Sequence, residues 1–252
     1  MIVEWRFKVL MLMLAASVQS AAAQPAQPPQ PPQGRYSLTV TKDITPYVTL
    51  TAEGAKLSDI AADLGRRLGA QVIVAPSLKD EKITAKFAGT PIEPAMLSIV
   101  PRALVDYEVR QDEQPRVLGI YLLGDADPEP SASAVVHGTS QGVMISGNTE
   151  DTGKPPAPDA PLRIIYNKKR LTLYAKQQPL MVVVMAVAEE LGVPAEIKDE
   201  NVELINANVK DTPAIEETIA GLSPNVRVYV RADANRLERT LLRIVLVRST
   251  LK

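Results

Sequence analysis

The feature that most constrains this chain is an internal repeat, because one apolar pattern occurs twice at a fixed distance of 123 residues. The first occurrence reads Val48-Thr-Leu-Thr, followed by Leu57, Ile60, Leu64, Leu68 and Gly69. The second occurrence reads Leu171-Thr-Leu-Tyr, followed by Leu180, Val183, Val187, Leu191 and Gly192. The stretches Phe87 to Pro91 and Val209 to Pro213 then match at a distance of 122 residues. Two copies of one pattern predict two similar units of structure.

The spacing within each copy predicts its elements. Apolar residues three, four and four apart form one helix face, a following Gly ends the helix, and alternating apolar residues indicate strands. Thr before Pro, with Glu93 three residues after Thr90, indicates the start of a second helix. We expect the order β-α-β-β-α-β-β. In the first copy the elements are Tyr47–Thr51, Lys56–Leu68, Gln71–Val74, Ile83–Phe87, a helix from Thr90-Pro91, Tyr107–Arg110 and Val117–Leu123. In the second they are Arg170–Tyr174, Pro179–Leu191, Ala195–Ile197, Val202–Val209, a helix from Thr212-Pro213, Val226–Arg231 and Leu241–Val247.

The fold class we expect is therefore α+β, with two small β-α-β-β-α-β-β domains joined by a disordered linker. About 90 residues are enough for one small core in each domain. The linker is rich in Pro, Gly, Ser and Asp, with one Lys and six acidic residues, so it should be solvated and mobile. The expected organisation is a signal peptide at 1–23, a Pro/Gln-rich spacer at 24–34, domain 1 at 35–124, the linker at 125–160 and domain 2 at 161–252.

The first segment has the pattern of an export signal. Arg6 and Lys8 form a basic start, Val9–Val18 is almost purely apolar, and Ala21-Ala22-Ala23 supplies a cleavage site before Gln24. The alternative is a retained anchor, although the apolar run is well short of the roughly 20 residues that span a bilayer. No later stretch is long and apolar enough to cross a membrane. We therefore expect a periplasmic mature protein without a transmembrane span.

Residues that carry chemistry are scarce. The chain has no Cys and a single histidine, His137, which lies in the linker without candidate partners nearby. Neither a phosphate-binding loop nor a nucleophile elbow occurs around Gly142–Gly147. Adjacent helical carboxylates such as Glu189-Glu190 and Glu216-Glu217 point about 100° apart and suit solvated faces. We expect no catalytic, cofactor-binding or metal-binding residues, and the balance of 28 basic and 29 acidic residues does not indicate a nucleic-acid partner.

Basic clusters have ordinary structural explanations. Arg66-Arg67 near the end of the first helix suits the negative helix terminus, and Lys168-Lys169-Arg170 suits the polar flank of a strand. Two apolar segments could take part in interactions. Leu241–Val247 suits either a core strand or an exposed edge strand that pairs with a partner. Val143-Met144-Ile145 is a short apolar segment in the linker that could dock on a partner.

The chain resembles the secretin and TonB short N-terminal domain. The resemblance rests on the order β-α-β-β-α-β-β, on the stretch LSDIAADLGRRLGAQVIVAPSLKDEKITAKFAGTPIEPAML, and on the short sequences YEVR and IYLL. Residues 46–124 resemble this domain along their whole length. Residues 170–250 resemble it more loosely, because Pro194 lies where the family usually has a strand residue. The second copy is also similar to the related KH-like domain of secretins. In that family the domain lies in the periplasm and contacts partner proteins, at a secretin pore or a TonB-dependent receptor.

The resemblance implies a non-enzymatic periplasmic interaction or assembly module. Its partners would be envelope proteins such as secretion or TonB-type transport components. The alternative is a periplasmic sensory or ligand-binding module for a small molecule or a cell-wall fragment. A cleft with convergent polar groups would favour this alternative, and exposed sheet edges would favour the interaction module.

Overall fold

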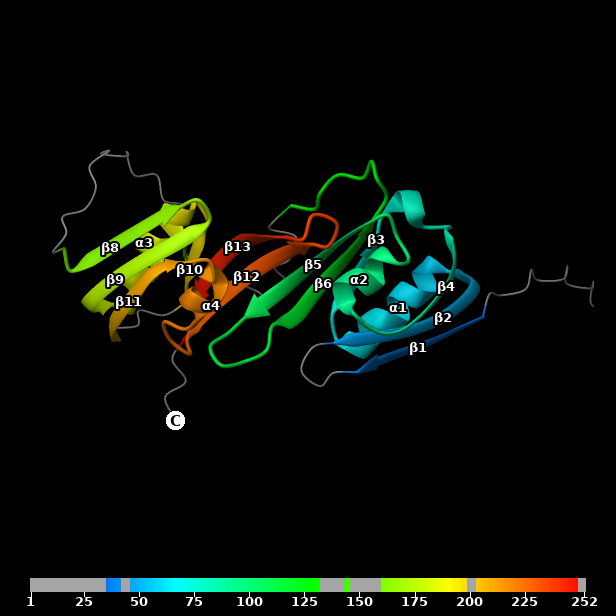
Figure 1. Ribbon diagram of the computed structural model, residues 1–252, viewed down its shortest axis with the longest axis horizontal. Coiled ribbons are helices and arrows are strands. Elements are labelled where there is room, and N and C mark those ends of the chain that lie inside the picture. Colours follow the sequence, from blue (N-terminus) through cyan, green and yellow to red (C-terminus); the bar gives the residue numbers. More distant parts are fainter. Residues whose placement is uncertain (1–34, 42–45, 132–142, 146–159, 199–202, 249–252) are drawn as a thin grey trace, which may run out of the picture. The chain divides into compact units, whose positions relative to one another are not determined.

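The computed structural model describes residues 35–41, 46–131, 143–145, 160–198 and 203–248, all within the unit Gly34–Lys252 (Figure 1). The described residues form mostly strands, with four α-helices. The α+β class expected from the sequence is confirmed.

Each copy has eight elements in the order β-β-α-β-β-α-β-β. The first copy contains β1 (Arg35–Thr41), β2 (Tyr47–Lys56), α1 (Leu57–Leu68), β3 (Gln71–Val74), β4 (Lys82–Pro91), α2 (Ile92–Leu97), β5 (Arg102–Val109) and β6 (Arg116–Leu123), with a 3-10 turn η1 (Pro76–Leu78) after β3. The second contains β8 (Leu162–Asn167), β9 (Arg170–Pro179), α3 (Leu180–Leu191), β10 (Ala195–Ile197), β11 (Leu204–Thr212), α4 (Ile215–Ala220), β12 (Val226–Asp233) and β13 (Glu238–Leu246). A short strand, β7 (Val143–Ile145), lies between the copies in sequence.

The first strand of each copy was absent from the expected order. β1 pairs antiparallel with β2, and β8 pairs antiparallel with β9. Within β1 only Leu38 is buried, and no residue of β8 is fully buried. These outer strands therefore carry only a weak apolar alternation.

Each copy folds around an aliphatic core between a three-stranded sheet of its own and strands of a seven-stranded sheet. The three-stranded sheet has the order β1-β2-β4 in the first copy and β11-β9-β8 in the second. In the first copy, α1 and α2 contribute Leu57, Ile60, Leu64 and Met96 to the core, together with apolar residues of β2, β5 and β6. The second core has the same construction, with Val183 and Val187 of α3 fully buried. The helix faces expected from the repeat are thus confirmed.

Helix ends follow the repeat, whereas the starts of the second helices do not. Gly69 and Gly192 end α1 and α3 with φ of 69° and 66°, a left-handed conformation that suits glycine. The starts expected at Thr90 and Thr212 are wrong, because α2 begins at Ile92 and α4 at Ile215. Pro91 is still extended, with φ −54° and ψ 153°, and no side chain caps α2. The extended backbone of β4 thus includes the Thr90-Pro91 pair and ends with it.

The division into two separate domains is not confirmed, because strands of both copies join in one seven-stranded sheet (Figure 1). Its order is β3-β6-β5-β12-β13-β10-β7, so β5 of the first copy pairs antiparallel with β12 of the second. β13 lies inside this sheet with Ile244 and Leu246 in the core, which confirms the core interpretation of Leu241–Val247.

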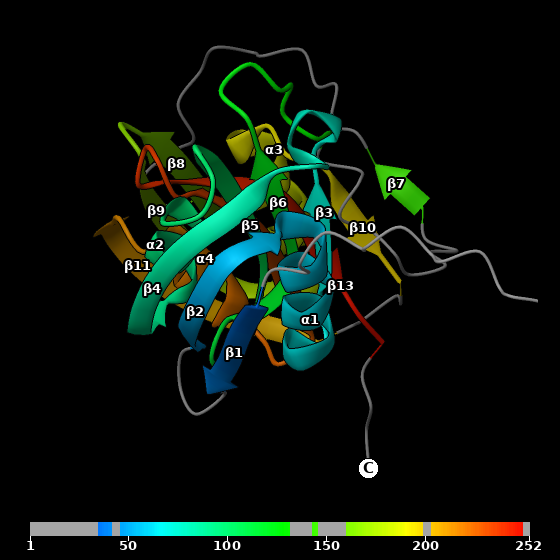
Figure 2. The same ribbon diagram turned by 90° about the vertical axis from the view of Figure 1, so that its right-hand side faces the viewer.

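Part of the segment expected as a disordered linker has defined contacts. Residues 125–131 are described, and β7 pairs antiparallel with β10, with Met144 opposite Glu196 (Figure 2). Residues 132–142 and 146–159 of the expected linker lie outside the described residues, as do the expected signal peptide and spacer.

Candidate functional site

The two copies meet in a symmetric register. Tyr107 of β5 pairs with Val230 of β12, and these two residues occupy equivalent positions, 123 residues apart. Antiparallel pairing of equivalent strands around one central pair corresponds to a local two-fold relationship. The bulges agree with it, because the register of β5 with β6 shifts between Asp106 and Tyr107, and that of β12 with β13 shifts between Tyr229 and Val230.

A buried ion pair lies beside the central pair. Arg231 donates from Nε and Nη2 to the two carboxylate oxygens of Asp106, at 2.8 and 2.9 Å. Asp106 is fully buried and Arg231 is 7% exposed. Burial raises the pKa of Asp106, while the hydrogen bonds and the charge of Arg231 oppose this shift. Both carboxylate oxygens of Asp106 therefore accept hydrogen bonds that join the two copies.

On the other side of the central pair, Glu108 faces the second copy. The Tyr229 hydroxyl lies 3.4 Å from Glu108 Oε1, and Arg227 Nε lies 3.8 Å from the same oxygen. Arg110 of the first copy donates to Glu108 Oε2 at 2.8 Å. The two acidic residues of β5 thus meet three arginines, two of them from β12.

The network continues to the outer strands of the second copy. The guanidinium of Arg243 on β13 lies 4.3 Å from the centre of the Tyr229 ring, and Arg243 Nη1 donates to Glu196 of β10 at 3.0 Å. On the first copy's side, Arg231 lies over the ring of Tyr121 on β6 at 5.1 Å. One face of five neighbouring strands therefore carries alternating acidic, basic and aromatic side chains, which we call the charged ladder: Tyr121, Asp106, Glu108, Arg231, Tyr229, Arg243 and Glu196.

The segment after β6 covers part of the charged ladder. Arg231 Nη1 donates to the carbonyl of Pro130, and Arg102 forms an ion pair with Glu129 at 2.9 Å. The carboxylate of Asp127 accepts hydrogen bonds from the Ser77 hydroxyl and the Gly124 amide, which lower the pKa of Asp127. These contacts fix residues 124–130 against the sheet.

The charged ladder could have been found from the sequence. β5 reads Leu104-Val-Asp-Tyr-Glu-Val and β12 reads Val228-Tyr-Val-Arg-Ala-Asp, so both place polar residues at every second position of an apolar strand. A strand of that kind buries one face and needs partners for the other. The signal missed was that one copy supplies acids where the other supplies Arg and Tyr.

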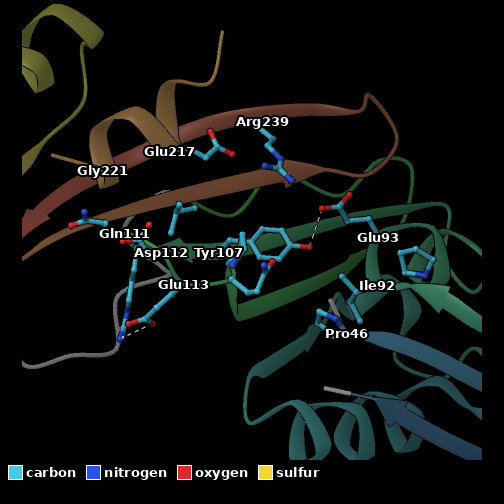
Figure 3. A pocket seen from close by; sticks show the side chains of 15 residues that line it. Pro46, Ile92, Glu93, Tyr107, Gln111, Asp112, Glu113, Glu217, Gly221 and Arg239 are labelled. Carbon is cyan, nitrogen blue, oxygen red and sulfur yellow. Dashed lines mark hydrogen bonds and ion pairs between the residues drawn. The ribbon is translucent and has the colours of Figure 1, made fainter. Parts of the chain in front are cut away.

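A groove of about 650 Å³ lies where the two copies meet, on the side of the second helices (Figure 3). Glu93 comes from α2, Tyr107 from β5, Glu217 from α4 and Arg239 from β13. The Tyr107 hydroxyl donates to Glu93 Oε1 at 2.9 Å, as the dashed line in Figure 3 shows. Burial, and then the charge of Glu93, raise the pKa of Tyr107 far above its ordinary value.

The groove combines an apolar part with polar groups. Pro46, Pro91, Ile92 and Val109 contribute apolar surface. The side chains of Glu217 and Arg239 have no hydrogen-bond or ion-pair partner among the described residues. An open groove with a few unpaired charges suits a small polar ligand.

A second hollow of about 870 Å³ lies within the second copy. It is bounded by Gly192 after α3, Pro213 before α4 and the turn between β12 and β13. On that turn Leu237 is 87% exposed and has a φ of 53°. An exposed leucine at a hairpin tip is a candidate contact point for a partner.

The basic residues singled out in the sequence have structural partners. Arg66 and Arg67 both form ion pairs with Asp63, which lies one turn earlier in α1. Lys169, in the turn between β8 and β9, pairs with Glu238 at 3.2 Å, and Arg170 pairs with Asp211 at 2.9 Å.

The acidic pairs do not form a common site. Glu190 accepts a hydrogen bond from the Tyr166 amide at 3.1 Å, which fastens α3 to β8. Glu217 lines the groove of Figure 3, and both Glu216 and Glu217 line the second hollow. His137 lies outside the described residues.

Comparisons with known proteins add no assignment, since no family model, no curated protein and no solved structure matches this chain. Among the residues that the structure describes, no group of three or more metal-binding side chains gathers. Within the same residues, no helix has the length and apolar character needed to cross a bilayer.

Proposed function

We propose that this protein is a non-enzymatic interaction or assembly module of the periplasm, related to the short N-terminal domains of secretins and TonB-dependent receptors. Its partners are envelope proteins such as secretion or TonB-type transport components. The observation that carries this proposal is the pairing of β7 with β10, in which a sheet edge accepts a strand from outside both copies. Addition of a strand to a sheet edge is a common way to bind an extended segment of a partner.

The arrangement of charged groups also supports binding rather than catalysis. The most deeply buried acid, Asp106, uses both carboxylate oxygens in its ion pair with Arg231. Glu196, the buried acid of β10, forms ion pairs through its two oxygens with Arg243 at 3.0 Å and with Lys198 at 3.4 Å. A general acid or base needs a free position within hydrogen-bond reach of a substrate, whereas these groups hold strands together.

The test is capture of partners by the mature chain. Tagged protein starting at Gln24 is incubated with an envelope extract and cross-linked to the proteins that bind it. The captured proteins are then identified by mass spectrometry. The proposal expects specific enrichment of membrane-associated envelope components, competed away by untagged protein. Recovery of nothing beyond a tag-only control contradicts it.

The alternative of a periplasmic sensory or ligand-binding module is favoured by one observation, the groove of Figure 3. It places the unpaired side chains of Glu217 and Arg239 beside the apolar surface of Pro91 and Ile92. A zwitterionic fragment of the cell wall carries both signs of charge and matches this lining.

The alternative is tested by titrating soluble cell-wall peptide fragments while amide shifts are followed by NMR. It expects shifts at residues lining the groove that are lost in Arg239→Ala. The matched control is Arg35→Ala, an exposed arginine on β1 that does not line the groove. Equal titration curves for Arg239→Ala and Arg35→Ala rule the alternative out.

A further inference from the structure

We infer that the outer edge of β3 binds an extended, uncharged, β-branched segment of another protein, antiparallel to β3. The inference rests on the proposed function as an interaction module, and it names the surface and the kind of partner.

β3 and β10 are equivalent strands of the two copies. β3 pairs parallel with β6, and β10 pairs parallel with β13. The backbone amide of Ala75 donates to Leu122 at 2.9 Å, and at the equivalent place Lys198 donates to Leu246 at 2.9 Å. What binds the outer side of β10 is therefore a guide to what the outer side of β3 accepts.

The two outer sides differ in occupancy. β10 carries β7, with Ala195 opposite Ile145 and Ile197 opposite Val143. β3 is the other end of the seven-stranded sheet, and no described strand pairs with its outer side. The first copy thus offers an open edge where the second copy has a filled one.

The main chain of β3 directs donors and acceptors outward. Because the Ala75 amide faces β6 and successive residues of a parallel strand alternate in direction, the backbone groups of Val72 and Val74 face the open edge. Unpaired groups of this kind are a template for another strand.

The side chains of β3 favour an apolar segment. The strand reads Gln-Val-Ile-Val, without the charge that protects exposed edges in many proteins. Ile73 is 36% exposed, whereas its equivalent in β10 is the buried and ion-paired Glu196. An uncharged, β-branched segment like Val143–Ile145 matches this edge.

The proline-rich spacer ahead of the first copy is not suited to form a second strand like β7. The spacer Gln24–Gln33 has proline at five of its ten positions. Proline has no amide hydrogen to donate and is poorly suited to a paired strand. The segment that fills the β3 edge is therefore expected from another protein.

The probe is a synthetic peptide with the sequence of residues 141–147, Gln-Gly-Val-Met-Ile-Ser-Gly, added to the mature chain. Amide hydrogen exchange at Val72 and Val74 is followed by NMR. We expect exchange at both amides to slow by about tenfold or more at saturating peptide, as new hydrogen bonds form. A control peptide with Pro in place of Met should leave exchange unchanged.

A variant tests the same edge from the protein's side. Val74→Pro removes an amide that faces outward and should abolish the effect of the peptide, while the amides of β6 keep their protection. If this variant does not fold, the exchange of Val72 and Val74 in the unaltered chain with added peptide tests the inference alone. Unchanged exchange at Val72 and Val74, or peptide protection confined to β10, overturns the inference. Dimerisation of the chain through β3, detected by mass, overturns it as well.

Partner capture separates this inference from the proposed function. Loss of captured envelope proteins in Val74→Pro supports the β3 edge as their binding surface. Undiminished capture by a folded Val74→Pro overturns the edge and leaves the proposed function standing. Absence of capture by the unaltered chain contradicts the proposed function itself, whatever the peptide does.

Discussion

Asp106 and Arg231 face each other across β5 and β12 and are joined by two hydrogen bonds, although 125 residues separate them in sequence. The position equivalent to Arg231 in the first copy is Glu108, and the position equivalent to Asp106 in the second copy is Tyr229. A first copy paired with another first copy in this register would place Asp106 opposite Glu108 twice. Like charges directly opposite each other destabilise a sheet, so the difference between the copies favours the mixed pair.

The first prediction concerns this ion pair. Arg231→Met should lower the free energy of unfolding by about 3–5 kcal/mol, because it leaves the buried carboxylate of Asp106 without its partner. The double variant Asp106→Leu with Arg231→Met should recover most of the loss, since apolar residues replace both charges. Denaturant unfolding measures both. A single variant as stable as the unaltered protein would show that the pair is not buried.

The second prediction concerns alkaline pH. Tyrosine in an unfolded chain ionises near pH 10, whereas burial beside Glu93 keeps the pKa of Tyr107 far above that value. Above about pH 10 the folded state therefore holds a proton that the unfolded state has lost, and stability falls as the pH rises. Stability from this group is fully present below that pH.

Tyr107→Phe should reduce the alkaline slope by about one proton, which is about 1.4 kcal/mol per pH unit. Urea titrations between about pH 9 and 11 measure this slope. The matched control is Tyr47→Phe, because Tyr47 is 42% exposed. Equal slopes for the two variants would remove Tyr107 from the explanation.

The third prediction concerns the equivalent core residues Leu64 and Val187, both fully buried. Leu64→Ala should cost about 2–5 kcal/mol, and Val187→Ala less, because truncating valine removes fewer buried carbon atoms. Since the copies share one sheet, each variant should shift one common unfolding transition. Two resolved transitions in calorimetry, only one of which moves, would show that the copies unfold separately.

The fourth prediction concerns export. A fusion of residues 1–33 to a reporter that is active only outside the cytoplasm should give activity, and the mature protein should begin near Gln24. Mass spectrometry of the exported protein locates its first residue. An intact Met1 on protein released from the membrane would contradict cleavage.

The sequence could predict what repeats locally. The spans of β3 and β10 agree with the expected strands, and the buried faces of α1 and α3 follow the apolar spacing. These elements bury one regular face, so their periodicity is visible in a short window. β1 and β8 bury too little to leave such a signal.

Pairing between distant segments could not be predicted in the same way. β5 and β12 are more than 100 residues apart, and hydrophobic periodicity carries no information about which strand lies beside which. The opposite charges of Asp106 and Arg231 were the available sign of their contact. The Thr-Pro pairs misled because their local preference for a helix start is weaker than the pairing that extends β4 and β11.

The most direct test of the shared seven-stranded sheet asks whether the copies stay together once the connection between them is cut. A protease site is introduced within residues 132–142, so that β7 remains with the second copy, and the cleaved protein is analysed by size-exclusion chromatography with light scattering. The shared sheet predicts one particle with the combined mass of both fragments, and separation of the fragments in the variant Arg231→Asp. Fragments of the unaltered sequence that elute separately would contradict the shared sheet.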